Sequence, residues 1–366
     1  CQGQMVPLFW PVIFAEEVEI SFAHTSFRWN NLASKNAGVS VVIVGLRQNA
    51  SQPKRLYEEG VSGEISRRDG DKLSPYLVLG TQAFVAKQSL PLSDLPEMEF
   101  GNKPSDGGNL LLDPHEISSL GLSDSQRAKF VRRIMGSEEF INGKPRHCLW
   151  IMTADLEEAE AIPALKTRID NVRKLRLASR DKGANALAKR AHQLKLMRIG
   201  SRQAIVVPGV SSERRPFLTP GLVDNTTTLT NAAFGLYDAE VWALSIISSR
   251  LHLVWIQTVC GQLETRLRYS NTMGWNTFPL PILTEKNKAD LTRCAEDILL
   301  AREAHFPATV ADLYDPDAMP ADLREAHERN DEVLERIYIG RRFKNDTERL
   351  ERLFDRYAKM TTKGAV

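Results

Sequence analysis

The sequence has few cysteines and lacks long apolar runs. Its four cysteines lie far apart and form no CxxC pair, which argues against a zinc site or a disulfide framework and favours reduced thiols in a cytoplasmic protein. The longest apolar runs, residues 39–46 and 251–256, are much shorter than the roughly 20 residues of a membrane helix. No basic region precedes the first apolar segment, so no signal peptide is predicted. We therefore expect neither a secreted nor a membrane protein.

What remains is the composition of a globular protein. The 366 residues are 42% hydrophobic and 26% charged, enough for two or three domains with their own cores. The net charge is only +2, so the chain is not uniformly basic. The sequence starts at Cys1 without a methionine and enters an apolar segment at once, which predicts a piece of a longer polypeptide.

Positive charge is concentrated in one stretch. Residues 154–202 are rich in Ala, Leu, Lys and Arg and predict helices that Gly183 interrupts. Between Lys166 and Arg202 twelve basic residues stand against two acidic ones, a local charge of +10 that leaves −8 for the rest. Such a block suits DNA phosphates, and the alternative is a solvated helical hairpin. The candidates for backbone contacts here are Arg173, Lys174, Arg176, Lys189 and Arg190.

A second charged pattern lies in residues 260–281, CGQLETRLRYSNTMGWNTFPLP. In a strand, alternate side chains share a face, so Glu264, Arg266 and Arg268 would line one edge about 7 Å apart. Glutamate accepts a hydrogen bond from cytosine N4, and arginine donates two to guanine, so this row suits base recognition. The alternative is an exposed strand with a solvated salt-bridge ladder.

The same stretch carries a resemblance. GQLETRLRYSNTMGWNTFPLP resembles the end of the target recognition domain in the Mme-type DNA methyltransferases of type IIG and type IIL restriction–modification systems. CQGQMVPLFWPVIF and FAHTSFRWNNLASKNAGVSVVIVGL, at the start, are similar to the last part of that family's methyltransferase domain. The resemblance covers most of the chain and implies double-stranded DNA as the partner.

The resemblance also shows what this chain lacks. It has no NPPF or NPPY tetrapeptide for adenine N6 methylation, no glycine-rich loop for S-adenosylmethionine and no placeable PD…ExK nuclease motif. We therefore expect no catalytic residue, no cofactor and no metal in this chain. The methyltransferase, its S-adenosylmethionine and any nuclease would lie upstream in the parent polypeptide.

At the N-terminus, residues 1–16 predict a buried helix, and residues 18–23 and 39–45 predict strands at the end of an open α/β sheet. The β-branched run 39–45 predicts a central strand covered on both faces. The resemblance implies that Phe27 and Trp29 lie near the flipped adenine, where aromatic rings can stack. The alternative is that both rings pack the edge of the domain.

Between these ends we expect a recognition domain of short strands and helices. Ser123 predicts the N-cap of a helix over residues 124–135, and residues 239–258 predict one buried helix. Arg214 and Arg215 lie in a polar loop and are candidates for phosphate contacts. The resemblance implies that Asn231 and Ala232 approach the bases, with the Ala232 region and Arg268 at a base pair next to that of Glu264 and Arg266.

From residue 284 the pattern is helical, with helices over residues 286–305, 321–338 and 345–360. The predicted fold is thus mixed α/β (α+β): the end of an open α/β methyltransferase sheet in residues 1–50, a mixed α/β target recognition domain in 51–283 and an all-α C-terminal domain in 284–366. The leading hypothesis is the DNA-recognition portion of an adenine-N6 methyltransferase. The rivals are a non-catalytic specificity or assembly module that binds protein partners through its helices, and an enzyme with an unrecognised site.

Overall fold

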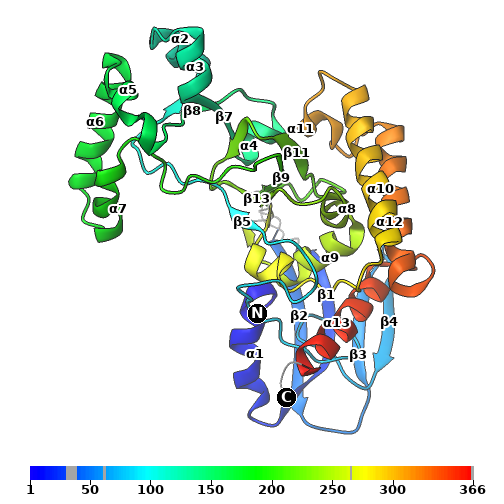
Figure 1. Ribbon diagram of the computed structural model, residues 1–366. Helices are drawn as coiled ribbons and strands as arrows, with labels where there is room; N and C mark the ends of the chain where they lie inside the picture. The colour runs from blue at the N-terminus through cyan, green and yellow to red at the C-terminus, as the bar shows by residue number, and fades with distance from the viewer. Residues whose placement is uncertain (30–38, 61–62, 264–265, 364–366) are drawn as a thin grey trace, which may run out of the picture.

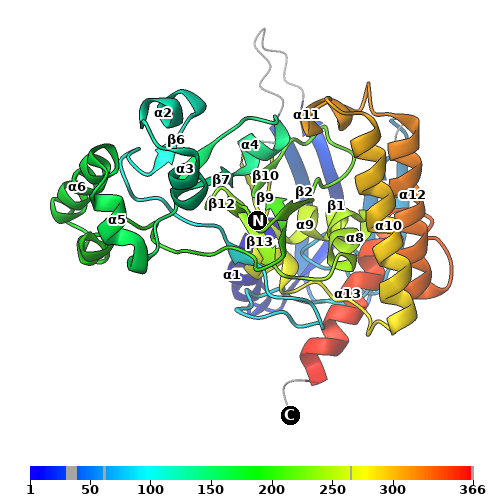
Figure 2. The same cartoon turned by 45° about the horizontal axis from the view of Figure 1, so that its top comes forward.

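The computed structural model of this chain describes residues 1–29, 39–60, 63–263 and 266–363 (Figure 1). Three parts follow one another: a first sheet with one helix, a central region with three small sheets, and a C-terminal group of helices. A helical lobe of the central region stands away from the rest in both orientations (Figures 1 and 2). The predicted mixed α/β fold is confirmed.

The first sheet has the strand order β2-β1-β3-β4. Its strands are β1 (Val18–Trp29), β2 (Val39–Gln48), β3 (Lys54–Glu59) and β4 (Ile65–Gly70). β1 pairs antiparallel with β2 and parallel with β3. The prediction of a central strand over residues 39–45 is wrong for the described sheet, because β2 is its edge strand, and Ile43 and Leu46 are 45% and 47% exposed. A β-branched run favours a strand but does not fix its neighbours.

The N-terminal helix α1 (Val6–Phe14) is present as predicted, after the short turn η1 (Gly3–Met5). Its predicted burial is wrong for most of its surface. Val6 and Trp10 are buried, whereas Leu8 and Val12 are each 69% exposed. An apolar composition shows that a helix can be covered, but not that the described residues cover it.

Three sheets build the central region. One has the order β11-β9-β13-β5, another β12-β7-β8-β6, and a third β10-β15-β14. Their strands are β5 (Glu99–Phe100), β6 (Leu111–Leu112), β7 (Val131–Met135), β8 (His147–Leu149), β9 (Gln203–Pro208), β10 (Val210–Ser211), β11 (Gly221–Asp224), β12 (Thr227–Leu229), β13 (Ala233–Tyr237), β14 (Gln262–Leu263) and β15 (Arg266–Arg268).

The helical lobe has its own core, in which Leu165, Ile169 and Val172 pack with Phe130 and Leu149. Its helices are α2 (Pro114–Ser119), α3 (Asp124–Phe130), α5 (Leu156–Glu160), α6 (Pro163–Leu177) and α7 (Lys182–Ala186), with the short turn η3 (Leu187–Arg190).

Two boundaries in this region differ from the prediction. Ser123 caps α3 through a capping box, as expected, but the helix ends at Phe130 and the chain continues as β7, so residues 131–135 form a strand. Gly183 does not interrupt the helical run. It lies inside α7, whose N-cap Asp181 accepts hydrogen bonds from the Gly183 and Ala184 amides. The cap therefore places the break at residues 178–181.

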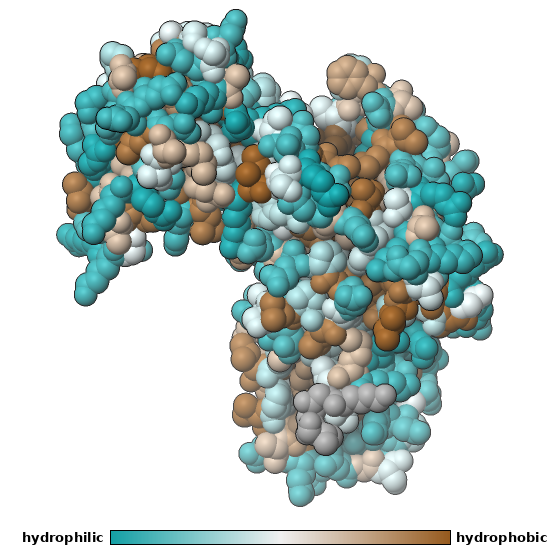
Figure 3. Space-filling view, viewed as in Figure 1, coloured by the Kyte–Doolittle hydropathy of each residue, from teal (hydrophilic) through white to brown (hydrophobic). Residues whose placement is uncertain are grey.

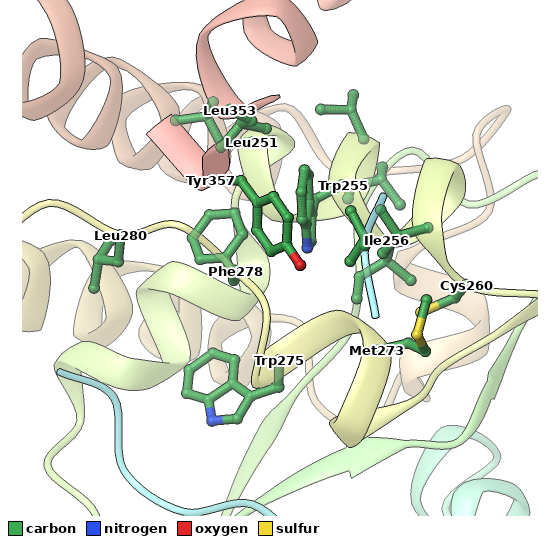
Figure 4. Packing of buried hydrophobic residues seen from close by; sticks show 14 of the residues in the cluster. Leu251, Trp255, Ile256, Cys260, Met273, Trp275, Phe278, Leu280, Leu353 and Tyr357 are labelled. Carbon is green, nitrogen blue, oxygen red and sulfur yellow. The ribbon is translucent and has the colours of Figure 1, made fainter. Parts of the chain in front are cut away.

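The predicted helix over residues 239–258 is two helices, α8 (Trp242–Ser248) and α9 (Arg250–Val259). Ser249 has extended ψ and caps α9 by accepting a hydrogen bond from the His252 amide. An apolar run does not reveal such a break, because both helices remain buried. Figure 4 shows the core around α9, where Trp255 lies beside Tyr357 and Ile256 near Met273 and Cys260.

The C-terminal helices are α10 (Glu285–Ala304), α11 (Val310–Leu313), α12 (Ala321–Ile339) and α13 (Asp346–Lys363). The three predicted long helices are confirmed, and Thr284 caps α10. Their apolar faces pack on α8 and α9. Buried Glu335 of α12 receives an ion pair from Arg349 of α13 at 2.5 Å. No helix among the described residues is long and apolar enough to cross a membrane.

Candidate nucleic-acid interface

Strand β15 alternates between buried and exposed side chains, as its sequence predicts. Leu267 and Tyr269, the residue after the strand, are buried, whereas Arg266 and Arg268 are exposed. β15 lies between β10 and β14, with Val210 opposite Arg268. The side chains of Arg266 and Arg268 therefore emerge from one face of a strand that is held on both sides. Glu264, the third member of the predicted row, lies outside the described residues.

A buried layer fixes the exposed edge from below. The Tyr269 hydroxyl and His252 Nε2 on α9 share a hydrogen bond of 2.8 Å, and both side chains are fully enclosed. Burial lowers the pKa of His252 to about 3, so the imidazole is neutral, and burial raises the pKa of Tyr269 above its ordinary range. His252 is thus a buried core residue whose hydrogen bond anchors Tyr269, the residue next to Arg268.

Asn231, Ala232 and Arg268 line the same cavity of about 540 Å³. Asn231 and Ala232 lie in the turn between β12 and β13, and all three residues are exposed. No described residue hydrogen-bonds or ion-pairs with the Arg268 guanidinium. Arg268 is more than thirty positions from Asn231 and Ala232 in the sequence, and only the family resemblance predicted that they lie close together. The structure places all three around one cavity.

Gly209 connects the two segments. Its amide donates hydrogen bonds to Ser137 Oγ at 2.9 Å and to the Ala232 carbonyl at 3.3 Å, and its own carbonyl accepts one from the Tyr269 amide at 3.0 Å. Ser137, the first residue of helix α4 (Ser137–Ile141), also donates to the Ala232 carbonyl. The turn and the strand are thus held in a fixed relation by backbone bonds.

Arg214 and Arg215 differ in their surroundings. Arg214 is exposed and pairs with Asp317, in the segment between α11 and α12, at 2.6 Å. Arg215 is half-buried, and no described residue provides a partner for its guanidinium; burial lowers its pKa. A half-buried cation without a counterion favours an anion such as phosphate, so Arg215 is the stronger candidate of the two.

The basic block of the helical lobe is only partly available. Lys174, Lys189 and Arg190 are exposed on α6 and η3. Arg173 forms ion pairs with Asp170 and with Glu160, the latter at 3.1 Å. Exposed ion pairs of this kind are weak, so Arg173 can still exchange its partners.

The prediction that Arg176 contacts the DNA backbone is wrong, because its side chain is buried. It is 1% exposed, and its guanidinium donates five hydrogen bonds to backbone carbonyls. The acceptors are the carbonyls of Pro104, Ser105, Leu187, Arg190 and Gln193, at 2.8–3.1 Å. A guanidinium has five N–H donors, so none remains for a phosphate. Arg176 instead joins α6 to the loop at residues 104–105, to η3 and to the segment after it.

Of the two aromatic residues predicted near a flipped base, Phe27 and Trp29, the structure describes only the side chain of Phe27. Phe27 on β1 is half-buried, and its ring packs edge-on against His24 with centroids 4.8 Å apart. Trp29 is the last residue of β1, and its side chain lies outside the described residues. Among the described residues, no group of three His, Cys, Asp or Glu side chains could hold a metal ion.

Sequence reasoning missed how the RYSNT…WNT motif shapes this surface. Asn271 donates to the Met98 carbonyl, Trp275 to that of Pro96 and Asn276 to that of Gln88, at 2.7–2.9 Å. The motif therefore holds the segment 88–98, which leads into β5. Phe100 on β5 lines the cavity beside Arg268, and no local pattern marks it, because β5 pairs with distant β13.

Three family models match consecutive parts of this chain. Residues 1–58 match the family described as MmeI, DNA-methyltransferase domain; residues 79–282 match MmeI, target recognition domain; and residues 283–364 match MmeI, C-terminal domain. The chain therefore belongs to the MmeI family, in line with the resemblance seen in its sequence.

Individual relatives are similar along the whole chain. "DNA methyltransferase A" of Bacillus subtilis (strain 168) is 38% identical over 361 residues, which are 98% of this chain and 40% of that protein. The structure of the type IIL restriction–modification enzyme MmeI in complex with DNA matches with a TM-score of 0.84 and 34% identity, over 99% of this chain and 48% of that one. This chain thus spans less than half the length of either relative.

Proposed function

We propose that this chain selects the DNA sequence at which a larger parent enzyme transfers a methyl group to adenine N6. The observation that carries the proposal is the convergence of Arg268, Asn231 and Ala232 on one cavity, beside a strand whose buried residues fix the arginine. The match to a target recognition domain and the similarity to a solved enzyme bound to DNA support it. The rival hypothesis, a module that binds protein partners through its helices, is not favoured. The apolar faces of the C-terminal helices pack on this chain's own core.

In this proposal Glu264, Arg266 and Arg268 contact base edges, with Asn231 and Ala232 at the base pair next to that of Glu264 and Arg266. Arg214 and Arg215 contact the DNA phosphates. Further phosphate contacts come from four side chains of the helical lobe: Arg173, Lys174, Lys189 and Arg190. The concave face between the lobe and the part that carries α1 would receive the duplex (Figure 3). Base contacts then determine the sequence, and phosphate contacts supply salt-dependent affinity.

The domains would follow the predicted limits: methyltransferase to residue 50, recognition domain from 51 to 283 and helical domain from 284. The first sheet continues to Gly70, so its last two strands would support the start of the recognition domain. DNA as ligand and four unpaired cysteines support a cytoplasmic location.

Methyl transfer would depend on segments of the parent enzyme beyond this chain. S-adenosylmethionine, the expected methyl donor, does not fit the described part of the first sheet. No described strand of that sheet leads into a helix N-terminus through a glycine-rich turn, the element that holds such nucleotides. We therefore assign the S-adenosylmethionine site and the catalytic residues to the part of the parent enzyme upstream of this chain. Any nuclease would lie there too.

The test is fluorescence-anisotropy binding of the chain to duplexes with a randomised centre, at several salt concentrations, with Arg266→Ala and Arg268→Ala alongside. Affinity that falls steeply with salt and is weaker in both variants supports the proposal. Binding that is insensitive to salt, or equal in the variants, contradicts it.

Specificity is tested in the parent enzyme. Replacing Glu264 by Lys and Arg266 by Asp exchanges an acceptor and a donor, so the preferred base pair should change at one position of the methylated site. Sequencing the methylated sites of both enzymes measures this. An unchanged site at every position would show that this row does not contact the bases.

A further inference from the structure

Phe100 is an exposed aromatic residue at the centre of the candidate interface. It is the second residue of β5, the edge strand of its sheet, and stands opposite Phe234 of β13. Its side chain is 51% exposed. In Figure 1 β5 lies where the helical lobe joins the rest of the molecule, on the side of the hollow in Figure 3.

The ring is held from beneath by other aromatic rings. Phe100 and Phe234 have ring centroids 4.5 Å apart, and Phe234 in turn lies 5.6 Å from Tyr269, the neighbour of Arg268. Phe234 and Tyr269 are both buried. A continuous aromatic layer therefore connects the exposed ring to the core that anchors β15.

The backbone around Phe100 is also fixed. Its carbonyl accepts a hydrogen bond from Arg198 at 3.1 Å, and Arg198 forms an ion pair with Glu99 at 2.7 Å. The Gly101 amide donates to the Ala233 carbonyl at 3.1 Å. A Cβ at Gly101 would lie 2.2 Å from the Thr230 carbonyl oxygen, so this close approach requires glycine. Phe100 is thus preorganised, and a ligand that contacts it need not order it first.

Two cavities meet at this ring. The larger, of about 540 Å³, contains Arg268 and Asn231, and the smaller, of about 240 Å³, contains Arg198 and Asn271. Glu97 and Glu99 also line the smaller cavity, where Glu99 pairs with Arg198, and Glu138 lines the larger one. An exposed ring among arginine, asparagine and glutamate side chains suits a nucleotide, which offers an apolar methyl, sugar or base face between polar edges that both donate and accept hydrogen bonds. A single exposed apolar residue on an ordinary surface needs no ligand, but this one adjoins the residues proposed to contact bases.

We propose that Phe100 packs against a nucleotide of the recognised DNA, next to the base pair that Arg268 contacts. This inference rests on the proposed function and extends it to a residue that provides an uncharged contact. The source of the apolar contact is either a thymine methyl group or a deoxyribose or base face.

The test compares Phe100→Ala and Phe100→Leu with the wild-type chain, on the duplex that the wild-type chain enriches from a library with a randomised centre. Phe306→Ala is the matched control, because Phe306 is 85% exposed and lies in the C-terminal region. Phe100→Ala should bind roughly tenfold more weakly, within the range of single aromatic–nucleotide contacts. Phe100→Leu should lose less affinity for the duplex than Phe100→Ala, and Phe306→Ala should bind as tightly as wild type.

The salt dependence separates this contact from a general structural loss. Phenylalanine neutralises no phosphate, so the slope of log affinity against log salt should be the same for Phe100→Ala and wild type. Equal melting temperatures of Phe100→Leu and wild type would show that the fold is intact. A changed slope, or a Phe100→Leu affinity that falls only in proportion to lost stability, would overturn the proposal.

Replacing each thymine of the enriched duplex by deoxyuridine distinguishes the two sources. If one replacement weakens wild type but not Phe100→Ala, the partner is a thymine methyl; if none does, it is a sugar or base face. Wild-type binding together with full affinity of Phe100→Ala overturns this inference alone. Failure of the wild-type chain to bind any duplex overturns the proposed function, and this inference with it.

Discussion

Arg176 on α6 and Arg268 on β15 carry the same guanidinium in opposite surroundings. Arg176 is enclosed and donates to five backbone carbonyls, whereas Arg268 is exposed beside a cavity and has no partner among the described residues. The sequence around Arg176 is much more basic. Local charge density therefore does not show whether a guanidinium is exposed, whereas alternation with buried neighbours does.

The largest expected effect is on stability. Arg176→Ala should lower the free energy of unfolding by about 3–5 kcal/mol, because five hydrogen bonds from an enclosed guanidinium are removed and a cavity is left in their place. Urea unfolding measures this, with exposed Lys174→Ala on the same helix as the control, which should change stability by less than about 0.5 kcal/mol. Equal stability of both variants would show that the hydrogen bonds of Arg176 do not stabilise the fold.

Arg268→Ala should affect DNA binding rather than stability. Its stability should equal that of wild type, while DNA binding weakens by about 1–3 kcal/mol, the contribution of one bidentate base contact. Titration of the enriched duplex and of its single base-pair variants measures the loss. Discrimination should disappear at one base pair; a uniform loss across all sequences would make Arg268 a phosphate contact instead.

The layer beneath Arg268 predicts a pH effect. His252 is buried and neutral, with a pKa lowered to about 3, so as pH falls below about 6.5 the unfolded chain gains a proton that the folded chain does not. This group should therefore cost up to about 1.4 kcal/mol of stability per pH unit below that value. His252→Gln, which can still hydrogen-bond Tyr269, should show a shallower decline in urea unfolding between neutral and mildly acidic pH. Parallel declines would contradict the assignment.

The smallest effect concerns the exposed lysines of the lobe. Lys174→Ala with Lys189→Ala should reduce the slope of log affinity against log salt by about 0.9 for each phosphate that is no longer neutralised, equally for all sequences. Lys286→Ala on α10 is the matched control, since Lys286 is exposed but distant from the lobe. An unchanged slope in the double variant would remove the lobe from the DNA interface.

Much of this fold follows from local sequence. The cap at Ser123, the three C-terminal helices and the alternation at residues 266–269 depend on side chains a few positions apart, where spacing is informative. The break at Ser249 was missed because an apolar run hides a serine that caps its own helix.

The remaining features depend on contacts between distant segments. Arg176 is buried because residues 104–105 fold over α6, and Phe100 joins the site because β5 pairs with β13. Neither partner lies within a window that periodicity can search. The prediction of Asn231, Ala232 and Arg268 as neighbours came from family resemblance, and the structure places them around one cavity.

The most direct measurement is sequence selection from the library with a randomised centre by the wild-type chain, Arg268→Ala and the Lys174/Lys189 double variant. We expect one enriched motif for the wild type, the same motif with weaker enrichment for the lysine variant, and loss of preference at one position for Arg268→Ala. An identical motif in Arg268→Ala, or no motif in the wild type, would contradict the claim that the β15 edge selects the DNA sequence.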